Sequence, residues 1–259
     1  MAELERCLAF LRALGERAAH RTVSSPVGVA YLDDRVPRVW SRNYLLVEKE
    51  LGQVTVEVLA HEADRVLGGA GLGHRKVEIY DGGTGKRLAL GFHELGWSVE
   101  CDVIMVAMRE PDRKPDAVTV EQVAIDELAP AWAESNRSDP SSSFDDDIAR
   151  QLVEGKRAVA AAIPTRFFAA RAGGEIASYC ELYSDGRTGQ IENVLTLLRF
   201  RNRGLARALV SHALAVSREA GDDLTFLVAN RDDWPKELYR KLGFDEVGFI
   251  YDFLRPPRA

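Results

Sequence analysis

A strand–turn–helix–strand run over residues 189–229 constrains the fold of this sequence more than any other part. The strand-like GQIENVLT leads into RFRNRGLARALV (residues 199–210), in which four arginines surround Gly204 at the start of a helix. The helix carries one apolar stripe, made by Leu205, Leu209, Ala213 and Val216. An apolar strand follows at residues 224–229. Two strands joined by a helix of this length predict parallel neighbours and a right-handed crossover.

The arginines stand out because the chain as a whole is acidic. Its 259 residues include 34 Lys and Arg against 40 Asp and Glu, a formal net charge of −6. Such a balance argues against a chain-wide basic surface for nucleic acid, so we expect any bound anion to be small and held locally. The hydrophobic share of 46% is typical of a globular protein, and the length suits two domains.

Nothing in the sequence predicts a secretion signal or a membrane anchor. Residues 1–20 have charges between apolar residues at helical spacing, which indicates an amphipathic helix. The three cysteines, Cys7, Cys101 and Cys180, are far apart and in apolar surroundings. We therefore expect reduced thiols, no metal site and a cytoplasmic location.

A charged segment with two prolines, residues 109–116, separates two patterned halves and predicts a linker. In the first half we expect strands at residues 27–32, 44–47, 75–80 and 99–108, and helices at 55–67 and before LGW at 95–97. The nearby DGGTGKR (residues 81–87) lacks the P-loop residues and predicts a tight loop. In the second half we expect a strand and helix at 118–134, a polar loop at 135–143, a helix from 145, and a hairpin of strands 165–171 and 175–183.

The loop around Gly204 has the chemistry of an anion site. A glycine removes a side chain where the backbone turns, so that successive amide groups can converge on an anion at the positive end of the helix dipole. The alternative is a surface loop with solvated arginines. The strand before it and the helix after it favour the anion site.

Two motifs resemble the GCN5-related N-acetyltransferase (GNAT) family. The segment RNRGLA matches its pyrophosphate loop, Q/R-x-x-G-x-G/A, with alanine at the last position. Further on, VANRDDWPKELYRKLGF (residues 228–244) supplies a strand ending at Asn230 and a tyrosine, Tyr239, three residues before LGF. The order and spacing of these elements make the resemblance specific. It covers residues 117–259 and only faintly the first half.

The resemblance implies a mixed α/β fold with a largely antiparallel twisted sheet, one splayed parallel strand pair and flanking helices. We expect a catalytic domain at 117–259, preceded by a smaller, degenerate related domain at 1–110. The recurrence of LGW as LGF, each after a short helix, favours an internal duplication, although so short a match can also arise by chance. We expect one coenzyme site, in the second half.

The family's site residues map onto positions of this chain. Amides from Asn202 to Ala206 would hold the diphosphate of acetyl-coenzyme A, with outer charge from Arg199, Arg201, Arg203 or Arg207, and Asn230 would contact the pantetheine arm. The expected cofactor-binding residues are Val194, Leu195, Thr196, Arg201, Asn202, Arg203, Gly204, Leu205, Ala206, Arg207 and Asn230. Val194, Leu195 and Thr196 would pair with the arm through their main chain.

The implied reaction is the attack of a neutral amine on a thioester. An aliphatic ammonium must first lose a proton, and the departing sulfur must gain one. Tyr239 is the expected general acid, or else a core tyrosine. Glu192 is the expected base, acting directly or through water. An amide freed at a bulge of the same strand could polarise the acetyl oxygen.

Eight residues separate Asn230 from Tyr239 where the family commonly has about six, so Asn230 is the less secure assignment. The alternatives are a module that binds acetyl-coenzyme A without turnover and a transferase of longer acyl groups. The acceptor is expected to contact residues 135–143 and the first half. We expect neither nucleic acid nor membrane among the partners, and a monomer or homodimer.

Overall fold

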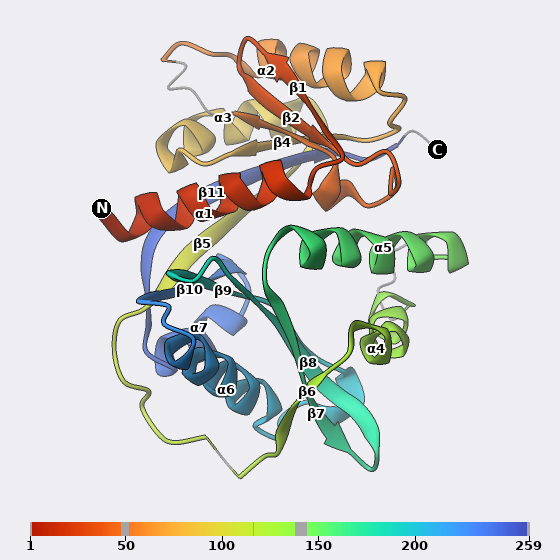
Figure 1. Ribbon diagram of the computed structural model, residues 1–259. Helices are drawn as coiled ribbons and strands as arrows, with labels where there is room; N and C mark the ends of the chain where they lie inside the picture. Colours follow the sequence, from red (N-terminus) through yellow and green to blue (C-terminus); the bar gives the residue numbers. More distant parts are fainter. Residues whose placement is uncertain (1, 48–51, 116, 138–143, 258–259) are drawn as a thin grey trace.

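The computed structural model describes residues 2–47, 52–115, 117–137 and 144–257 (Figure 1). The strands are β1 (Arg21–Ser25), β2 (Gly28–Leu32), β3 (Tyr44–Val47), β4 (Arg75–Ile79), β5 (Ser98–Ala107), β6 (Val120–Val123), β7 (Thr165–Ala172), β8 (Glu175–Ser184), β9 (Thr188–Thr196), β10 (Leu224–Asn230) and β11 (Phe244–Arg255). The helices are α1 (Ala2–Ala18), α2 (Val56–Ala63), α3 (Gly82–Glu94), α4 (Ile125–Arg137), α5 (Asp146–Ala162), α6 (Leu205–Glu219) and α7 (Pro235–Lys241). Short helical turns are η1 (Trp40–Arg42), η2 (Asp64–Gly68) and η3 (Leu198–Phe200). None of the helices in the described ranges is long and apolar enough to span a bilayer.

The strands form one mixed, largely antiparallel sheet, and this confirms the predicted fold class. Their order is β1-β2-β3-β4-β11-β5-β10-β9-β8-β7-β6. The long strands β5 and β11 run side by side between the two lobes (Figure 1). β5, from the first half, pairs with β10 of the second, and β11, from the second half, pairs with β4 of the first. The last strand of each half, β5 or β11, is therefore paired with a strand of the other half.

This exchange bears on the domain boundaries. The predicted domains, residues 1–110 and 117–259, remain a prediction. If the two halves were separated at the linker, β5 and β11 would lose the strands of the other half with which they pair. We therefore expect the halves to fold together.

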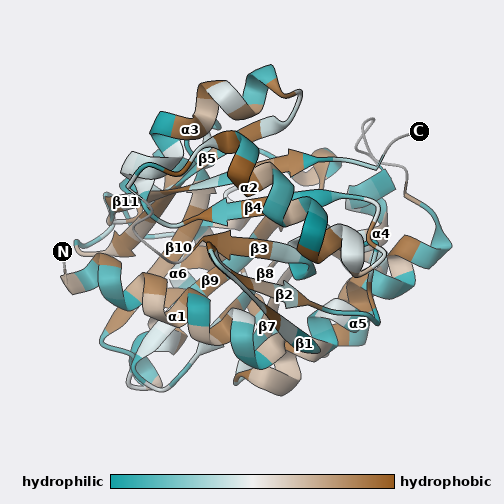
Figure 2. Ribbon diagram, turned by 90° about the horizontal axis from the view of Figure 1, so that it is seen from above, coloured by the Kyte–Doolittle hydropathy of each residue, from teal (hydrophilic) through white to brown (hydrophobic). Residues whose placement is uncertain are grey.

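Helices cover both faces of the sheet, and the strands alternate accordingly. On β4, Val77 and Ile79 pack in a buried cluster with side chains of α2 and α3. Their neighbours Lys76 and Glu78 point to the other face, where α1 and α5 lie. In Figure 2 the strands are largely hydrophobic, whereas the helices carry both hydrophobic and hydrophilic residues. This second face positions the candidate site.

The same order of elements occurs twice along the chain. β3 and β4 are parallel neighbours, as are β9 and β10, and this confirms the predicted crossover in the second half. After each pair comes a helix, α3 or α7, and a glycine in the left-handed region, Gly96 at φ 78° or Gly243 at φ 92°. The LGW and LGF motifs thus end equivalent helices.

Two expectations for the first half differ from the structure. The segment DGGTGKR is not a tight loop: α3 begins at Gly82, and the Asp81 carboxylate caps it by accepting a hydrogen bond from the Thr84 amide at 2.6 Å. The cap and the following apolar residues outweigh the glycines. An additional strand, β1, pairs with β2 through a tight turn.

Candidate functional site

The site begins where β9 and β10 part. Their last paired residues are Ile191 and Leu227, although both strands continue further. Beyond this point Leu195 and Thr196 pair only with β8, opposite Tyr179 and Ser178. In the described residues, β9 is thus not paired with β10 beyond Ile191, as a splayed pair requires.

A bulge lies at the same point of β9. The register with β8 shifts between Tyr179 and Glu181, and Asn193 has a positive φ of 52°. The Asn193 amide group donates a hydrogen bond to the buried Glu181 carboxylate at 2.9 Å, which helps to hold this conformation. A bulge thus lies where β9 leaves β10. That an amide freed there polarises the acetyl oxygen stays a prediction.

The loop before α6 has the geometry of an anion site. Gly204 occupies the N-cap position with φ 73°, and Asn202 is also left-handed, with φ 64°. Within the described residues, the backbone amides of residues 202–206 donate no hydrogen bond to protein oxygen. Gly204 is thus outside the helix, and five successive amides are available to a ligand at its positive end.

The four arginines of this loop differ in their partners. Arg199 forms ion pairs with Glu134 and Glu175, and Arg207, buried at its side chain, pairs with Asp112 of the linker at 2.7 Å. Arg201 and Arg203 have no carboxylate partner in the described part of the chain. Their guanidinium groups contact backbone oxygens at 3.4 Å. They are the better candidates for holding an anion, and Arg207 the poorer one.

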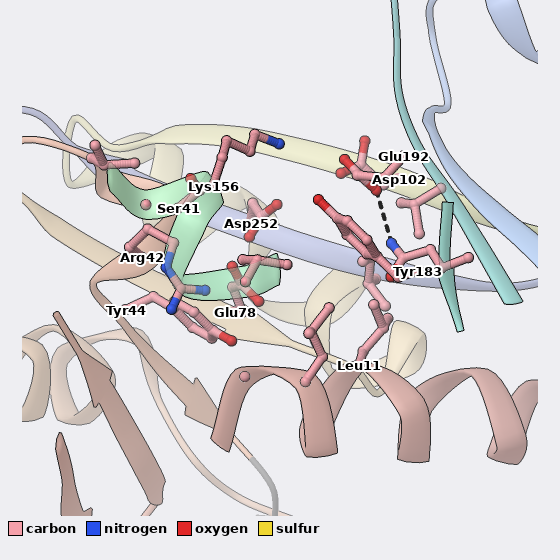
Figure 3. A pocket seen from close by; sticks show the side chains of 18 of the residues that line it. Leu11, Ser41, Arg42, Tyr44, Glu78, Asp102, Lys156, Tyr183, Glu192 and Asp252 are labelled. Atoms are coloured by element: carbon pink, nitrogen blue, oxygen red, sulfur yellow. Dashed lines mark hydrogen bonds between the residues drawn. The ribbon is translucent and has the colours of Figure 1, made fainter. Parts of the chain in front are cut away.

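A pocket of about 380 Å³ opens at the mouth of the splay, on the face of α1 and α5 (Figure 3). Glu192 of β9 and Val228 of β10 line it, each directly after the last paired residue of its strand. Strands of the first half line the opposite side. A group emerging between β9 and β10 would enter this pocket.

Glu192 points into this pocket, which fixes the side of the strand that the sequence left open. Burial raises its pKa, and the nearby ammonium of Lys156 counteracts part of that rise. The Gln190 amide donates a hydrogen bond to its carboxylate at 2.8 Å (Figure 3). A carboxylate of raised pKa is a stronger base than one in water.

Tyr239 lies on the other face of the sheet, on α7. Its ring is buried in the cluster of α6 and α7 with Cys180 and Leu227. Burial raises the pKa of the phenol, and the charge of Glu192 adds to this. The phenol is thus protonated at neutral pH and can donate a hydrogen bond. The structure brings Tyr239 and Glu192 to opposite sides of the splayed strands.

Asn230 is at the end of β10, at the rim of the pocket. Its side-chain oxygen accepts a hydrogen bond from the Asp232 amide at 2.9 Å and so orders the inserted turn before α7. Its side chain therefore has a local structural task as well. Of the predicted polar loop at 135–143, residues 138–143 are outside the described residues.

Sequence reasoning missed three pocket carboxylates, Glu78, Asp102 and Asp252. They are on β4, β5 and β11, and only the exchange of strands between the halves brings them to Glu192 (Figure 3). One signal was present. Within KVEIY, charged residues alternate with apolar ones, which indicates a strand with one polar face.

The sequence of the second half matches a known family. Residues 125–244 match the model of the acetyltransferase (GNAT) family. Among curated proteins, no sequence match was found.

Solved structures match nearly the whole chain. A GCN5-related N-acetyltransferase from Kribbella flavida has 19% identity and a TM-score of 0.65, with 99% of this chain and 96% of that chain covered. A functionally unknown protein from Staphylococcus epidermidis has 15% identity and a TM-score of 0.68, with coverages of 92% and 94%. A tandem GNAT protein from the clavulanic acid biosynthesis pathway has 14% identity and a TM-score of 0.55, with coverages of 92% and 82%. At these identities the likeness shows the fold alone, and it extends over both halves of the chain.

Proposed function

We propose, because residues 125–244 match the model of the acetyltransferase (GNAT) family, that the protein transfers an acetyl group from acetyl-coenzyme A to a primary amine. The observation that carries the proposal is the alignment of three features along one line. Free amides at residues 202–206 lie at one end, the unpaired edge of β9 in the middle, and the pocket at the far end.

The residues present fit the coenzyme. The five amides would hold its diphosphate, with Arg201 and Arg203 supplying outer charge. Residues 194–196 would pair their main chain with the pantetheine arm, which has amide groups like a peptide. The thioester would then lie at the bulge, between Tyr239 on one face and Glu192 on the other.

Each proton of the reaction has a place in this arrangement. An alkylammonium loses two protons when it becomes an amide. Glu192 takes one, directly or through water, and passes it to solvent, because its raised pKa suits a base. The amine lone pair forms the C–N bond, the C–S bond breaks, and Tyr239 gives its proton to the sulfur. The nitrogen then releases its second proton to solvent, from which the Tyr239 phenolate regains one. The amide turned out at the bulge stabilises the negative charge that develops on the acetyl oxygen.

The test is to replace Tyr239 by Phe and to measure rate and cofactor affinity separately. We expect kcat to fall by about a hundredfold or more, the usual contribution of general acid catalysis, with the Kd of acetyl-coenzyme A unchanged. Thiol release over a panel of amines measures the rate, and calorimetry the affinity. Binding without transfer to any amine would instead indicate a regulatory module. Faster transfer of longer acyl groups would correct the acyl preference.

A further inference from the structure

The pocket beside Glu192 has a surplus of negative charge that its own cations do not balance. Two cations line it, Arg42 and Lys156. The Lys156 ammonium is paired with the fully buried Glu181, with its Nζ 2.8 Å from Oε1, and Arg42 lies 3.8 Å from the buried Asp33. Both partners are carboxylates behind the pocket wall. Lys156 is therefore neutralised. Asp33 is bound more closely by Arg35, at 2.7 Å, so Arg42 keeps its positive charge.

Four carboxylates face the same space, in two groups. The outer group, Glu78 and Asp252, shares one cation, Lys76, whose Nζ is 2.8 Å from Glu78 and 3.3 Å from Asp252. The inner group, Asp102 and Glu192, has no ion pair among the residues that the structure describes. When all four carboxylates are ionised, one negative charge thus remains in the outer group and two in the inner group, against the one positive charge of Arg42.

Unsatisfied polar atoms point to a missing partner at this place. Five buried side-chain atoms in the described residues lack a hydrogen bond, and two of them, which no ion pair reaches either, belong to residues of this pocket: Arg42 Nε and Gln190 Oε1. Gln190 is only 4% exposed. Buried polar groups are nearly always satisfied in folded proteins, so these atoms call for a ligand or water. The Gln190 oxygen is an acceptor and requires a donor.

We propose that this pocket is a subsite for an aliphatic acceptor with two cationic amino groups, one at the inner carboxylates and the other at the outer ones. This deepens the proposed function and rests on it. The inner amine would lie beside Glu192, where the acetyl group emerges. The outer ammonium would pair with Glu78 and Asp252. These groups are on β4 and β11, and two strand spacings, about 10 Å, separate β4 from the inner strand β5.

The titration of the pocket agrees with this geometry. Burial raises the pKa of Glu78 to about 7, and burial with repulsion from Asp252 raises that of Asp102 to about 7. A bound dication would lower both values, because it supplies the opposite charge. Binding near pH 7 should therefore release protons, which calorimetry in buffers of different ionisation enthalpy measures.

Three amines with five-carbon chains test whether the pocket recognises a second positive charge. Cadaverine, pentylamine and 5-aminopentanoate offer the same nucleophile with a cationic, apolar or anionic far end. We expect kcat/KM for cadaverine to exceed that for pentylamine by about thirtyfold, as for a hydrogen-bonded charge, with the amino acid slowest.

The variant Glu78→Gln removes the outer surplus while leaving Lys76 paired with Asp252, so the fold is retained. We expect the ratio of kcat/KM for cadaverine to that for pentylamine to fall from about thirty to about three or less. The control is Glu94→Gln, an exposed carboxylate on α3, across the sheet from the pocket. It should keep the full preference. Thermal unfolding checks that both variants are folded.

Equilibrium binding of cadaverine, without acetyl-coenzyme A, separates the two proposals. Binding that Glu78→Gln abolishes, with no transfer to any amine, would support the cation subsite and contradict the transferase. Transfer to cadaverine and pentylamine at equal rates would overturn the subsite and leave the transferase standing. Preference for 5-aminopentanoate would also overturn it, since Arg42 and Lys156 would then be the recognising groups.

Discussion

The two parallel strand pairs occupy equivalent places in the halves, and their helices begin in different ways. At the start of α6, Gly204 has φ 73° and the amides around it are free. At the start of α2, Thr55 has an extended backbone with φ −105°. Its neighbours Val54 and Val56 are buried, and the Val54 carbonyl accepts a hydrogen bond from Arg87 of α3 at 2.9 Å. The helix start in the first half thus packs against protein, where its counterpart has room for a ligand.

The comparison indicates how the two halves differ in their contribution to the pocket. The second half has the free amides before α6 and the splay. The first half, through β4 and β5, contributes carboxylates to the pocket where the splay opens. The exchange of β5 and β11 makes the first half part of the second half's site.

The largest effect is expected where the equivalent glycines after α3 and α7 differ in surroundings. A Cβ on Gly243 would lie 2.1 Å from the Arg109 carbonyl oxygen, whereas one on Gly96 would meet no atom within 4 Å. Both positions are left-handed, so Gly96→Ala should cost about 1 kcal/mol of unfolding free energy. Gly243→Ala should cost about 3 kcal/mol or more, because the linker backbone must also move. Urea denaturation of both variants measures the difference, and equal losses would contradict it.

The helix starts themselves provide the next comparison. Gly204→Val should weaken binding of coenzyme A by about a hundredfold, because a β-branched residue disfavours the left-handed conformation that aims the amides. Thr55→Val, at the equivalent start of α2, should leave the Kd unchanged. Titration calorimetry with both variants gives the result. Equal effects would place the coenzyme elsewhere.

Asp102 in the first half and Asp245 in the second have pKa shifts of opposite sign. Their contributions to the free energy of unfolding should therefore depend on pH in opposite ways. Asp102, with a pKa of about 7, keeps a proton in the folded state that the unfolded chain has released above about pH 4. The free energy of unfolding therefore falls as pH rises from 4 to 7, and Asp102→Asn should remove this slope and add about 1 kcal/mol at pH 8.

Asp245 of the second half has the opposite sign. The ion pair with Arg109 lowers its pKa, so its stabilisation is present at neutral pH and is lost as the pH falls through that lowered value. Asp245→Asn should thus be slightly destabilising at pH 7. The Asp245 slope lies below about pH 4, and the Asp102 slope lies above it. Chemical denaturation from below pH 4 to pH 8 therefore measures both, and slopes of the same sign would contradict the assignment.

The smallest effect concerns the arginines. Arg199 already has two acidic partners, so Arg199→Gln should change the Kd of coenzyme A by less than about threefold. Arg201→Gln should weaken binding by about tenfold, and less at high salt, because no carboxylate of the described residues competes for it. A larger loss at Arg199 would mean that the ligand displaces Glu134 and Glu175.

The elements and the turn at Gly204 could be predicted from sequence because their signals are local. Gly204, the apolar stripe of α6 and the glycines after LGW and LGF each act within a few residues. The pocket could not be predicted, since Glu78, Asp102 and Asp252 are brought together by the order of strands. The helix of DGGTGKR was missed because its Asp81 cap outweighs the glycines, which local propensity alone does not reveal.

The most direct test of the account is a crystal structure with acetyl-coenzyme A bound. The account predicts a single coenzyme, with its diphosphate on the amides of residues 202–206, its arm along β9, and its acetyl group directed into the pocket at Glu192. A coenzyme bound between β3 and β4, or a diphosphate away from Gly204, would contradict it.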